Sequence, residues 1–235
     1  MSTYVIGDIH GELEQLKCLI AKMNLKEEDK LYILGDVVDR GPNPIKALQY
    51  LMTIPNCVCL AGNHEVMMLS NTKLLLRKVD ATLLKTLPSE DIERLIHWLN
   101  NGAASTISEM TELSSEERNK VIEYVGDFDI YVELEVEGKK YFLVHGGMNN
   151  FSPDKELDDY EIDDFVWARP DYSEAYYEDV IVVTGHTPTF LIPENPNPGY
   201  IFKGNNHIAV DCAAFAQKGR LAGICLETGE EFYSR

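Results

Sequence analysis

Five short segments of the sequence combine carboxylate, imidazole and amide side chains with glycine. They are Gly7-Asp8-Ile9-His10-Gly11, Gly35-Asp36-Val37-Val38-Asp39-Arg40-Gly41, Gly62-Asn63-His64-Glu65, His145-Gly146-Gly147 and Gly185-His186-Thr187-Pro188. Four of the six histidines of the chain lie in these segments. Mixed oxygen and nitrogen ligands suit Mn, Fe or Zn better than Ca or Mg, which favour all-oxygen shells. The residue types therefore predict a transition-metal site.

The spacing within the segments fits a site for two ions. Asp8 and His10 alternate by two, so a locally extended chain would direct both at one ion. A carboxylate such as Asp36 can bridge two ions, which lie about 3.5–4 Å apart in such sites and generate hydroxide near neutral pH. The ligand set is completed by Asn63, His145 and His186. One such motif alone is usually a structural turn, but five in order, each after an apolar run, predict chemistry.

The elements that position these segments alternate between strand and helix. Short apolar runs at Thr3–Ile6, Lys30–Leu34 and Cys57–Leu60 predict strands, and Glu12–Met23 and Pro44–Met52 predict helices between them. Such units imply a parallel sheet whose working loops lie at the carboxyl ends of its strands. Glycines beside the functional residues allow positive φ and close backbone approach.

Residues 66–125 predict a helical insertion packed over one side of the sheet, within a single domain spanning residues 1–235. The helix signals are Leu74-Leu75-Leu76, Leu83-Leu84 and Ile92–Leu99, with an N-terminal cap at Ser89 and a capping box of Ser114 with Glu117.

The second half of the chain is rich in predicted strands. They are Tyr131–Val136, Tyr141–Val144, Val180–Val183, Ile208–Asp211 and Leu221–Leu226, the first two joined by a Glu137-Gly138-Lys139-Lys140 hairpin. The whole pattern predicts an α/β fold, a β-sandwich of mixed sheets flanked by helices.

The charge and the cysteines exclude several classes of protein. With 21 basic and 39 acidic residues the net charge is −18, which disfavours nucleic acid and anionic membranes as partners. The five cysteines form no CxxC pair, which predicts reduced, structural thiols. No signal peptide and no apolar run of about 18 residues is visible, so a cytoplasmic protein without a membrane span is expected.

The GDIHG, GDVVDRG, GNHE, HGG and GHTP segments resemble, in order and spacing, those of the calcineurin-like metallophosphoesterases. The resemblance is to the PPP-type phosphoprotein phosphatases in their compact bacterial and phage form, and it covers essentially the whole chain. Trp98-Leu99-Asn100-Asn101-Gly102 and Trp167-Ala168-Arg169 resemble two further segments of the phage-like branch. The resemblance implies an α/β/β/α architecture.

The resemblance also implies a role for each site residue. The first metal would be held by Asp8, His10 and Asp36, and the second by Asp36, Asn63, His145 and His186. His64 would be the general acid, Asp39 would orient it, and Arg40 and Arg169 would bind phosphate together with Asn63. The implied cofactors are two divalent ions, with Mn expected and Fe or Zn as alternatives.

Three functions remain open from the sequence. The first is hydrolysis of phosphate monoesters by metal-bound hydroxide, by a Ser/Thr or dual-specificity protein phosphatase, acting on a phosphorylated protein or a small phosphoester. The second is a dinucleoside polyphosphate hydrolase of the bis(5'-nucleosyl)-tetraphosphatase kind, whose related motifs often end in GNHD. The third is a catalytically dead binding module, which the complete ligand set disfavours.

Ala61 keeps the second function open, because family members often have a basic residue immediately before GNHE. Lys203 and Lys218 are candidate replacements for that lost phosphate contact. His97 is expected to serve packing or lie on the surface, and His207 to be structural. Asp211, at a strand end near the expected site, is either structural or a support for a ligand.

Overall fold

The structure is a computed structural model that describes residues 1–77 and 87–235. The predicted helical pair Leu83-Leu84 lies outside these residues. In the described part of the chain, no helix is both long and apolar enough to cross a bilayer.

The first sheet has five strands in the order β10-β9-β1-β2-β3, three from the N-terminal part of the chain and two from its C-terminal end. The parallel strands are β1 (Thr3–Ile6), β2 (Lys30–Ile33) and β3 (Cys57–Cys59), and the antiparallel ones are β9 (Ala222–Cys225) and β10 (Glu231–Tyr233). Helices α1 (Leu13–Met23) and α2 (Pro44–Leu51) follow β1 and β2. α1 forms because Leu13, Leu16 and Leu19 repeat at helical spacing and are buried, each contributing about 1.5–3 kcal/mol by leaving water.

The second sheet has the order β4-β5-β6-β8-β7. Its strands are β4 (Tyr131–Val136), β5 (Lys139–Val144), β6 (Val180–Thr184), β7 (Phe202–Gly204) and β8 (His207–Ala209). β5, β6 and β8 run parallel, while β4 and β7 pair antiparallel at the two edges. The β4–β5 link is shorter than predicted, because Glu137 and Gly138 both adopt positive φ and turn the chain in two residues.

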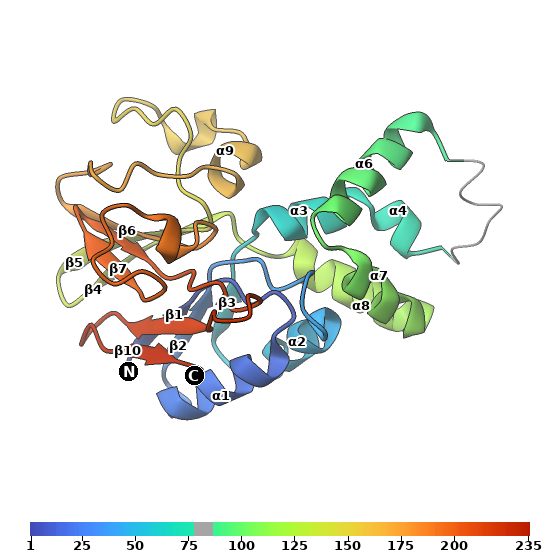
Figure 1. Cartoon of the computed structure of the whole chain (residues 1–235), viewed down its shortest axis with the longest axis horizontal. Coiled ribbons are helices and arrows are strands. Elements are labelled where there is room, and N and C mark those ends of the chain that lie inside the picture. The colour runs from blue at the N-terminus through green and yellow to red at the C-terminus, as the bar shows by residue number, and fades with distance from the viewer. Residues whose placement is uncertain (78–86) are drawn as a thin grey trace.

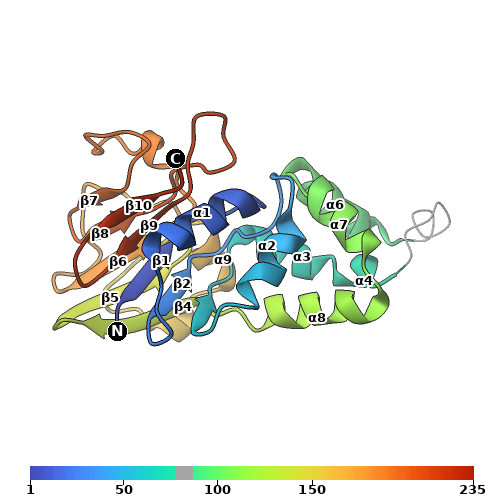
Figure 2. The same cartoon turned by 90° about the horizontal axis from the view of Figure 1, so that it is seen from below.

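The two sheets pack face to face with helices outside them, as predicted (Figures 1 and 2). Successive side chains of a strand are buried on opposite faces of the sheet. In β1, Val5 packs in the core between the two sheets, and Ile6 packs in the core that includes α1. In the same way Leu143 enters the core between the sheets, and Phe142 enters a third cluster on the outer face. That outer face also packs against Phe165 of the short helix α9 (Ile162–Val166).

The helices of the predicted insertion lie beside the β3 edge, as Figures 1 and 2 show. They are α3 (Asn63–Ser70), α4 (Thr72–Leu75), α6 (Ser89–Asn100), α7 (Ala104–Glu112) and α8 (Ser115–Gly126). α6 and α8 pack against α3, and α7 packs against α2, so the insertion rests mainly on these two helices. Its buried Trp98 belongs to the same core cluster as Leu16 of α1.

One of the two predicted helix caps is wrong. Ser89 is already the first helical residue of α6, and the extended Pro88 precedes it as the cap. The Ser114 capping box is confirmed, because the Glu117 amide donates to the Ser114 hydroxyl at 3.3 Å and the Ser114 amide donates to the Glu117 carboxylate at 2.8 Å.

Candidate dinuclear metal site

The five glycine-containing segments converge where parallel strands of the two sheets end. The loops after β1, β2 and β3 come from the first sheet, and those after β5 and β6 come from the second. Asp36 lies buried at their centre, with Oδ2 3.5 Å from Nε2 of His10 and Oδ1 3.5 Å from Nε2 of His145. Because each loop follows a strand of a rigid sheet, the sandwich itself fixes these side chains relative to one another.

Two groups of three buried side chains offer metal-ligand atoms within 4.8 Å of one another. In the described residues they are His10, Asp36 and His64, and Asp36, His145 and His186. Asp36 belongs to both groups, as a carboxylate that bridges two ions would. Asn63 joins the second group, since its Oδ1 lies 3.2 Å from Nε2 of His145. The arrangement can hold two divalent ions.

The imidazoles are oriented for ligation before any ion binds. Nδ1 of His10 donates to the Val38 carbonyl at 3.0 Å, and Nδ1 of His145 donates to the Leu34 carbonyl at 2.7 Å. These bonds place the ring proton on Nδ1, so Nε2 carries the lone pair that a metal ion would accept. Burial lowers the pKa of all three histidines that would ligate, to about 3 for His186, so the rings are neutral as ligation requires.

Buried carboxylates crowd the same pocket. Both oxygens of Asp8 accept the His186 amide, at 3.0 and 3.1 Å. Burial, and then the charges of Asp211 and Asp36, raise the pKa of Asp8 well above its usual range, and burial raises the pKa of Asp211 to about 6. Buried anions in one pocket need cationic partners, which fits bound divalent ions. Asp8 lies outside both donor groups, so its ligand role stays a prediction.

Asp36 has the opposite electrostatic environment. Burial raises the pKa of its carboxyl, but the surrounding imidazoles, with His145 and His64 the largest contributors, lower that pKa well below the usual range. Asp36 is therefore ionised and available as a ligand.

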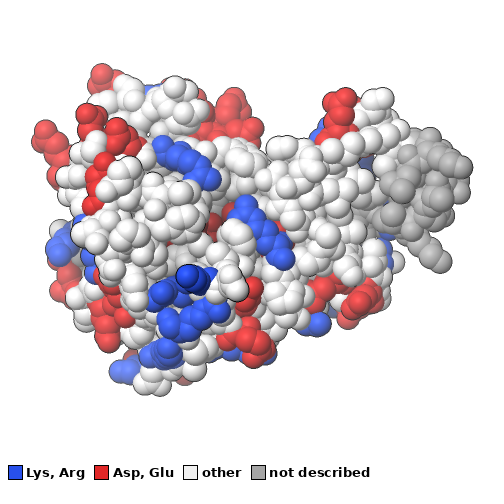
Figure 3. Space-filling model, in the orientation of Figure 1, with Lys and Arg blue, Asp and Glu red and all other residues white. Residues whose placement is uncertain are grey.

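Two arginines border the donors. Nη1 of Arg40 lies 2.7 Å from Nε2 of His10, and its Nη2 lies 2.9 Å from Nε2 of His64, so the guanidinium borders both imidazoles. Arg169 is exposed and donates to the His186 carbonyl at 3.2 Å. Figure 3 shows basic side chains towards the middle of this face and acidic ones mostly around its margin. The local charge thus favours an anionic ligand despite the net charge of −18.

His64 and Asp39 form the predicted pair. Nδ1 of His64 donates to Oδ2 of Asp39 at 2.7 Å, and the Asp39 carboxylate also accepts Trp98 Nε1 at 2.7 Å and Thr106 Oγ1 at 2.5 Å. Burial lowers the pKa of His64, but the carboxylates of Asp36 and Asp39 outweigh it, so the pKa is raised. The pair suits proton donation by Nε2, and helices α6 and α7 supply the groups that hold it.

Glu65 is a supporting residue to which the sequence analysis assigned no role. Its carboxylate accepts the backbone amides of Asp36 at 2.7 Å, Val37 at 2.8 Å, Val38 at 3.2 Å and Gly62 at 2.9 Å. The loop that carries Asp36 is thereby fastened to the start of α3. The available signal was the position of Glu65 directly after the site residues of the GNHE segment.

Backbone conformations near the donors are unusual. His10, Asp36 and His186 adopt positive φ of 46°, 49° and 57°, which non-glycine residues seldom do outside functional sites. Gly62 confirms the predicted close approach, because a Cβ there would overlap with the Asp36 carboxylate. The site therefore tolerates no side chain at this turn.

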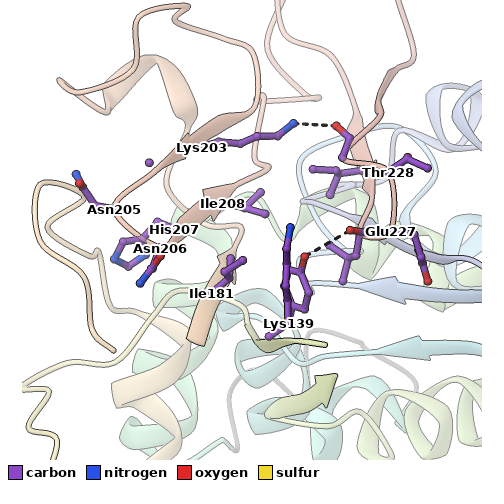
Figure 4. Close-up of a pocket in the computed structure, with 14 residues that line it drawn as sticks. Lys139, Ile181, Lys203, Asn205, Asn206, His207, Ile208, Glu227 and Thr228 are labelled. Carbon is purple, nitrogen blue, oxygen red and sulfur yellow. Dashed lines mark hydrogen bonds between the residues drawn. The ribbon is translucent and has the colours of Figure 1, made fainter. Parts of the chain in front are cut away.

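The residues considered as replacements for a basic side chain before GNHE do not enter the donor groups. Ala61 is buried and its amide donates to the Asp129 carbonyl at 2.8 Å. Lys203 pairs with Glu231 at 2.6 Å and lines a separate cavity of about 330 Å³ (Figure 4). That cavity includes Lys139, the first residue of β5, so it lies at the end of the sandwich opposite the metal loops. Lys203 is thus the wrong candidate, and Lys218 is exposed in the same loop as Phe215.

The remaining candidates have separate surroundings. His97 is exposed, as expected, and its ring lies 6.0 Å from that of Trp167. His207 is buried, and its Nε2 donates to the Glu174 carbonyl at 3.0 Å, which fits a structural role. Asp211 is buried in the site pocket and accepts the Ala213 amide at 2.8 Å. All five cysteines are free thiols, and none belongs to a donor group in the described residues.

The calcineurin-like phosphoesterase family model matches residues 1–225, and the chain belongs to this family. Among curated proteins, it is 42% identical over 103 residues to a symmetrical bis(5'-nucleosyl)-tetraphosphatase of Pseudomonas fluorescens, and 35% identical over 116 residues to one of Erwinia tasmaniensis. These matches cover 42% and 48% of this chain, but only 36% and 42% of the relatives.

Solved structures share the fold over the whole chain. A protein provisionally assigned as a diadenosine tetraphosphatase superposes with a TM-score of 0.61 at 17% identity, covering 99% of this chain and 92% of that one. A protein serine/threonine phosphatase of Saccharomyces cerevisiae superposes with a TM-score of 0.56 at 14% identity, covering 99% and 79%. At these identities the likeness concerns the fold.

Proposed function

We propose that the chain hydrolyses dinucleoside tetraphosphates in a metal-dependent reaction, cleaving the polyphosphate in the middle to release two nucleoside diphosphates. The similarity to symmetrical tetraphosphatases carries the choice of substrate. The donor groups that share Asp36 support the choice of reaction. The second function left open by the sequence is thus favoured over the phosphoprotein phosphatase placed first.

The residues around the donors would have different roles in such a reaction. The ions, when bound, would polarise the phosphoryl group and activate water. Arg40 and Arg169 would bind phosphate oxygens, since their guanidinium groups border the pocket. His64 would give the proton on Nε2 to the leaving phosphate oxygen, while Asp39 accepts from Nδ1 and keeps the ring oriented.

A phosphorylated protein is the second candidate substrate, on two features of the sequence. Glu65 completes a GNHE rather than a GNHD segment, and Arg40 lies in the DRG pattern of the phosphoprotein phosphatases. Both candidates use the same metal pocket, so only the substrate separates them.

The test is a comparison of kcat/KM for diadenosine tetraphosphate, a phosphoserine peptide and an aryl phosphate, with Mn²⁺, Zn²⁺ or Fe²⁺ added. We expect diadenosine tetraphosphate to have the highest kcat/KM and ADP to be its sole nucleotide product. Preference for the phosphopeptide, or release of ATP with AMP, would overturn the proposal.

A further inference from the structure

Two large exposed aromatic side chains contact histidines of different donor groups. The Trp167 ring lies 6.1 Å from that of His186 and nearly perpendicular to it, and the Phe215 ring lies 5.2 Å from that of His10. Trp167 and Phe215 are 38% and 41% exposed. Aromatic rings of this size left in solvent beside a polar site provide stacking surfaces for a planar ligand.

The two rings differ in what already covers them. The Arg40 guanidinium lies over the Phe215 ring, with Cζ 4.6 Å from its centre, so that side chain already holds a cation. Trp167 instead lines a cavity of about 330 Å³ between α3, α6 and α9. Figure 1 shows these three helices around this part of the molecule, and Figure 3 shows the surface notched between α9 and α6.

The walls of this cavity match the chemistry of a nucleobase. Val66 and Met67 of α3 supply apolar surface, and the His97 ring stands 6.0 Å from the Trp167 ring. Glu93 and Asp163 place carboxylates on the lining, where they would accept hydrogen bonds from an exocyclic amine. The lining also includes Arg94, whose guanidinium is paired with the Asp91 carboxylate. A flat, uncharged group is favoured here, while its phosphates lie at the metal pocket beyond Trp167.

We propose that the cavity between α3, α6 and Trp167 is the subsite for one nucleobase of the substrate, which stacks on the Trp167 indole. This inference rests on the proposed function and names the contact that would distinguish a nucleotide from a simple phosphoester. Trp167 acts here as a specificity residue, because its indole lines the cavity and its ring centre lies 6.1 Å from that of His186.

Intrinsic fluorescence tests the subsite without turnover. The chain has two tryptophans, and Trp98 is fully buried, so a quencher that stacks on the surface reports Trp167. With the Zn²⁺-loaded protein, we expect ADP to quench the emission and pyrophosphate, which lacks a base, to leave it unchanged. In the Trp167→Phe variant, neither ADP nor pyrophosphate should quench the emission. Equal responses to ADP and pyrophosphate, no response to ADP, or a response to a phosphopeptide alone would overturn the subsite.

Kinetics supply the second readout. Trp167→Ala should lower kcat/KM for diadenosine tetraphosphate about tenfold relative to that for the aryl phosphate, through KM, because one stacking contact is lost. Trp167→Phe keeps an aromatic face and should stay near the wild-type ratio. Phe190→Ala, which removes a 51% exposed ring outside the cavity lining, is the matched control.

The two proposals fail in different ways. If the wild-type chain does not hydrolyse diadenosine tetraphosphate, the proposed function is wrong, while the ADP titration still decides the subsite. If Trp167→Ala lowers turnover of both substrates in parallel, Trp167 only supports His186 and the subsite is wrong.

Discussion

At the scale of single residues, the histidines of the pocket differ in the hydrogen-bond partner of Nδ1. His10 and His145 direct Nδ1 to backbone carbonyls, whereas His64 directs Nδ1 to the Asp39 carboxylate. A carbonyl partner keeps an imidazole neutral, and a carboxylate partner stabilises the imidazolium. His64 lies within a donor group by distance, and its carboxylate partner fits the proposed role as the acid.

Replacing the proposed acid separates these two roles. His64→Ala should lower kcat about 10²-fold or more for an alkyl phosphate, whose leaving oxygen needs a proton. The loss should be smaller for a nitrophenyl phosphate, whose leaving group departs as an anion. Steady-state kinetics on both substrates and the metal content of the purified variant are measured. A lost metal ion, or equal losses on both substrates, would make His64 a ligand instead.

The shared carboxylate is the second residue-level test. Asp36→Asn and His145→Ala should each lower the amount of bound metal and abolish metal-dependent turnover of an aryl phosphate. Asp36→Asn changes a ligand of both donor groups, and His145→Ala removes a ligand of the second group. Metal content and turnover are measured together. Unchanged turnover in both variants would refute the site assignment.

At the scale of elements, the loop after β2 is held by helices from elsewhere in the chain. Trp98 of α6 and Thr106 of α7 fix Asp39, and Glu65 of α3 fixes the loop of Asp36. The helices of the predicted insertion therefore contribute to the site, since they supply hydrogen bonds to Asp39, the partner of His64.

Glu65 offers a test of this fastening. In Glu65→Gln the amide group would face backbone N–H donors, and we expect the free energy of unfolding to fall by on the order of 2–3 kcal/mol. Urea unfolding measures the change. Glu112→Gln, an exposed site at the end of α7, removes the same charge and serves as the control. Equal midpoints for the two variants would show that the four amide contacts contribute little.

At the scale of the whole molecule, the metal pocket joins the two sheets. Asp36 follows a strand of the first sheet, whereas His145 and His186 follow strands of the second. A bound ion would therefore cross-link both halves of the sandwich, and it would also neutralise the carboxylates buried between them.

Metal should accordingly stabilise the fold. At about 100 times its Kd, a ligand that binds only the folded state adds about 2.7 kcal/mol, which corresponds to roughly 5–10 °C in Tm for a chain of this size. Calorimetry with Mn²⁺ and after chelation measures the shift. Asp36→Asn should lose most of it, and a Tm that is independent of metal in the wild type would contradict the cross-link.

The elements near the site were largely predictable because their signals are local. The predicted bounds agree to within one residue at each end for β1, β2, β3, α1 and α2. Apolar runs followed by glycine indicate the strands, and apolar residues at helical spacing indicate the helices. β7 and β10 were missed because their three residues include a charged residue and form no apolar run, unlike the three residues of β3. The Asp39 contacts join residues 59 and 67 positions apart, and no local periodicity encodes such pairs.

By itself the sequence determined the family, the strand-end segments and the inventory of donors, because parallel strands bring their carboxyl ends to one edge wherever the chain folds as a sandwich. Only the tertiary structure decided which donors come within reach of one ion, leaving Asp8 outside the two groups and placing Arg40 over His10 and His64. It also decided that Lys203 lies at the far end and that Trp167 lines a cavity. These outcomes depend on packing between distant segments, which sequence spacing does not specify.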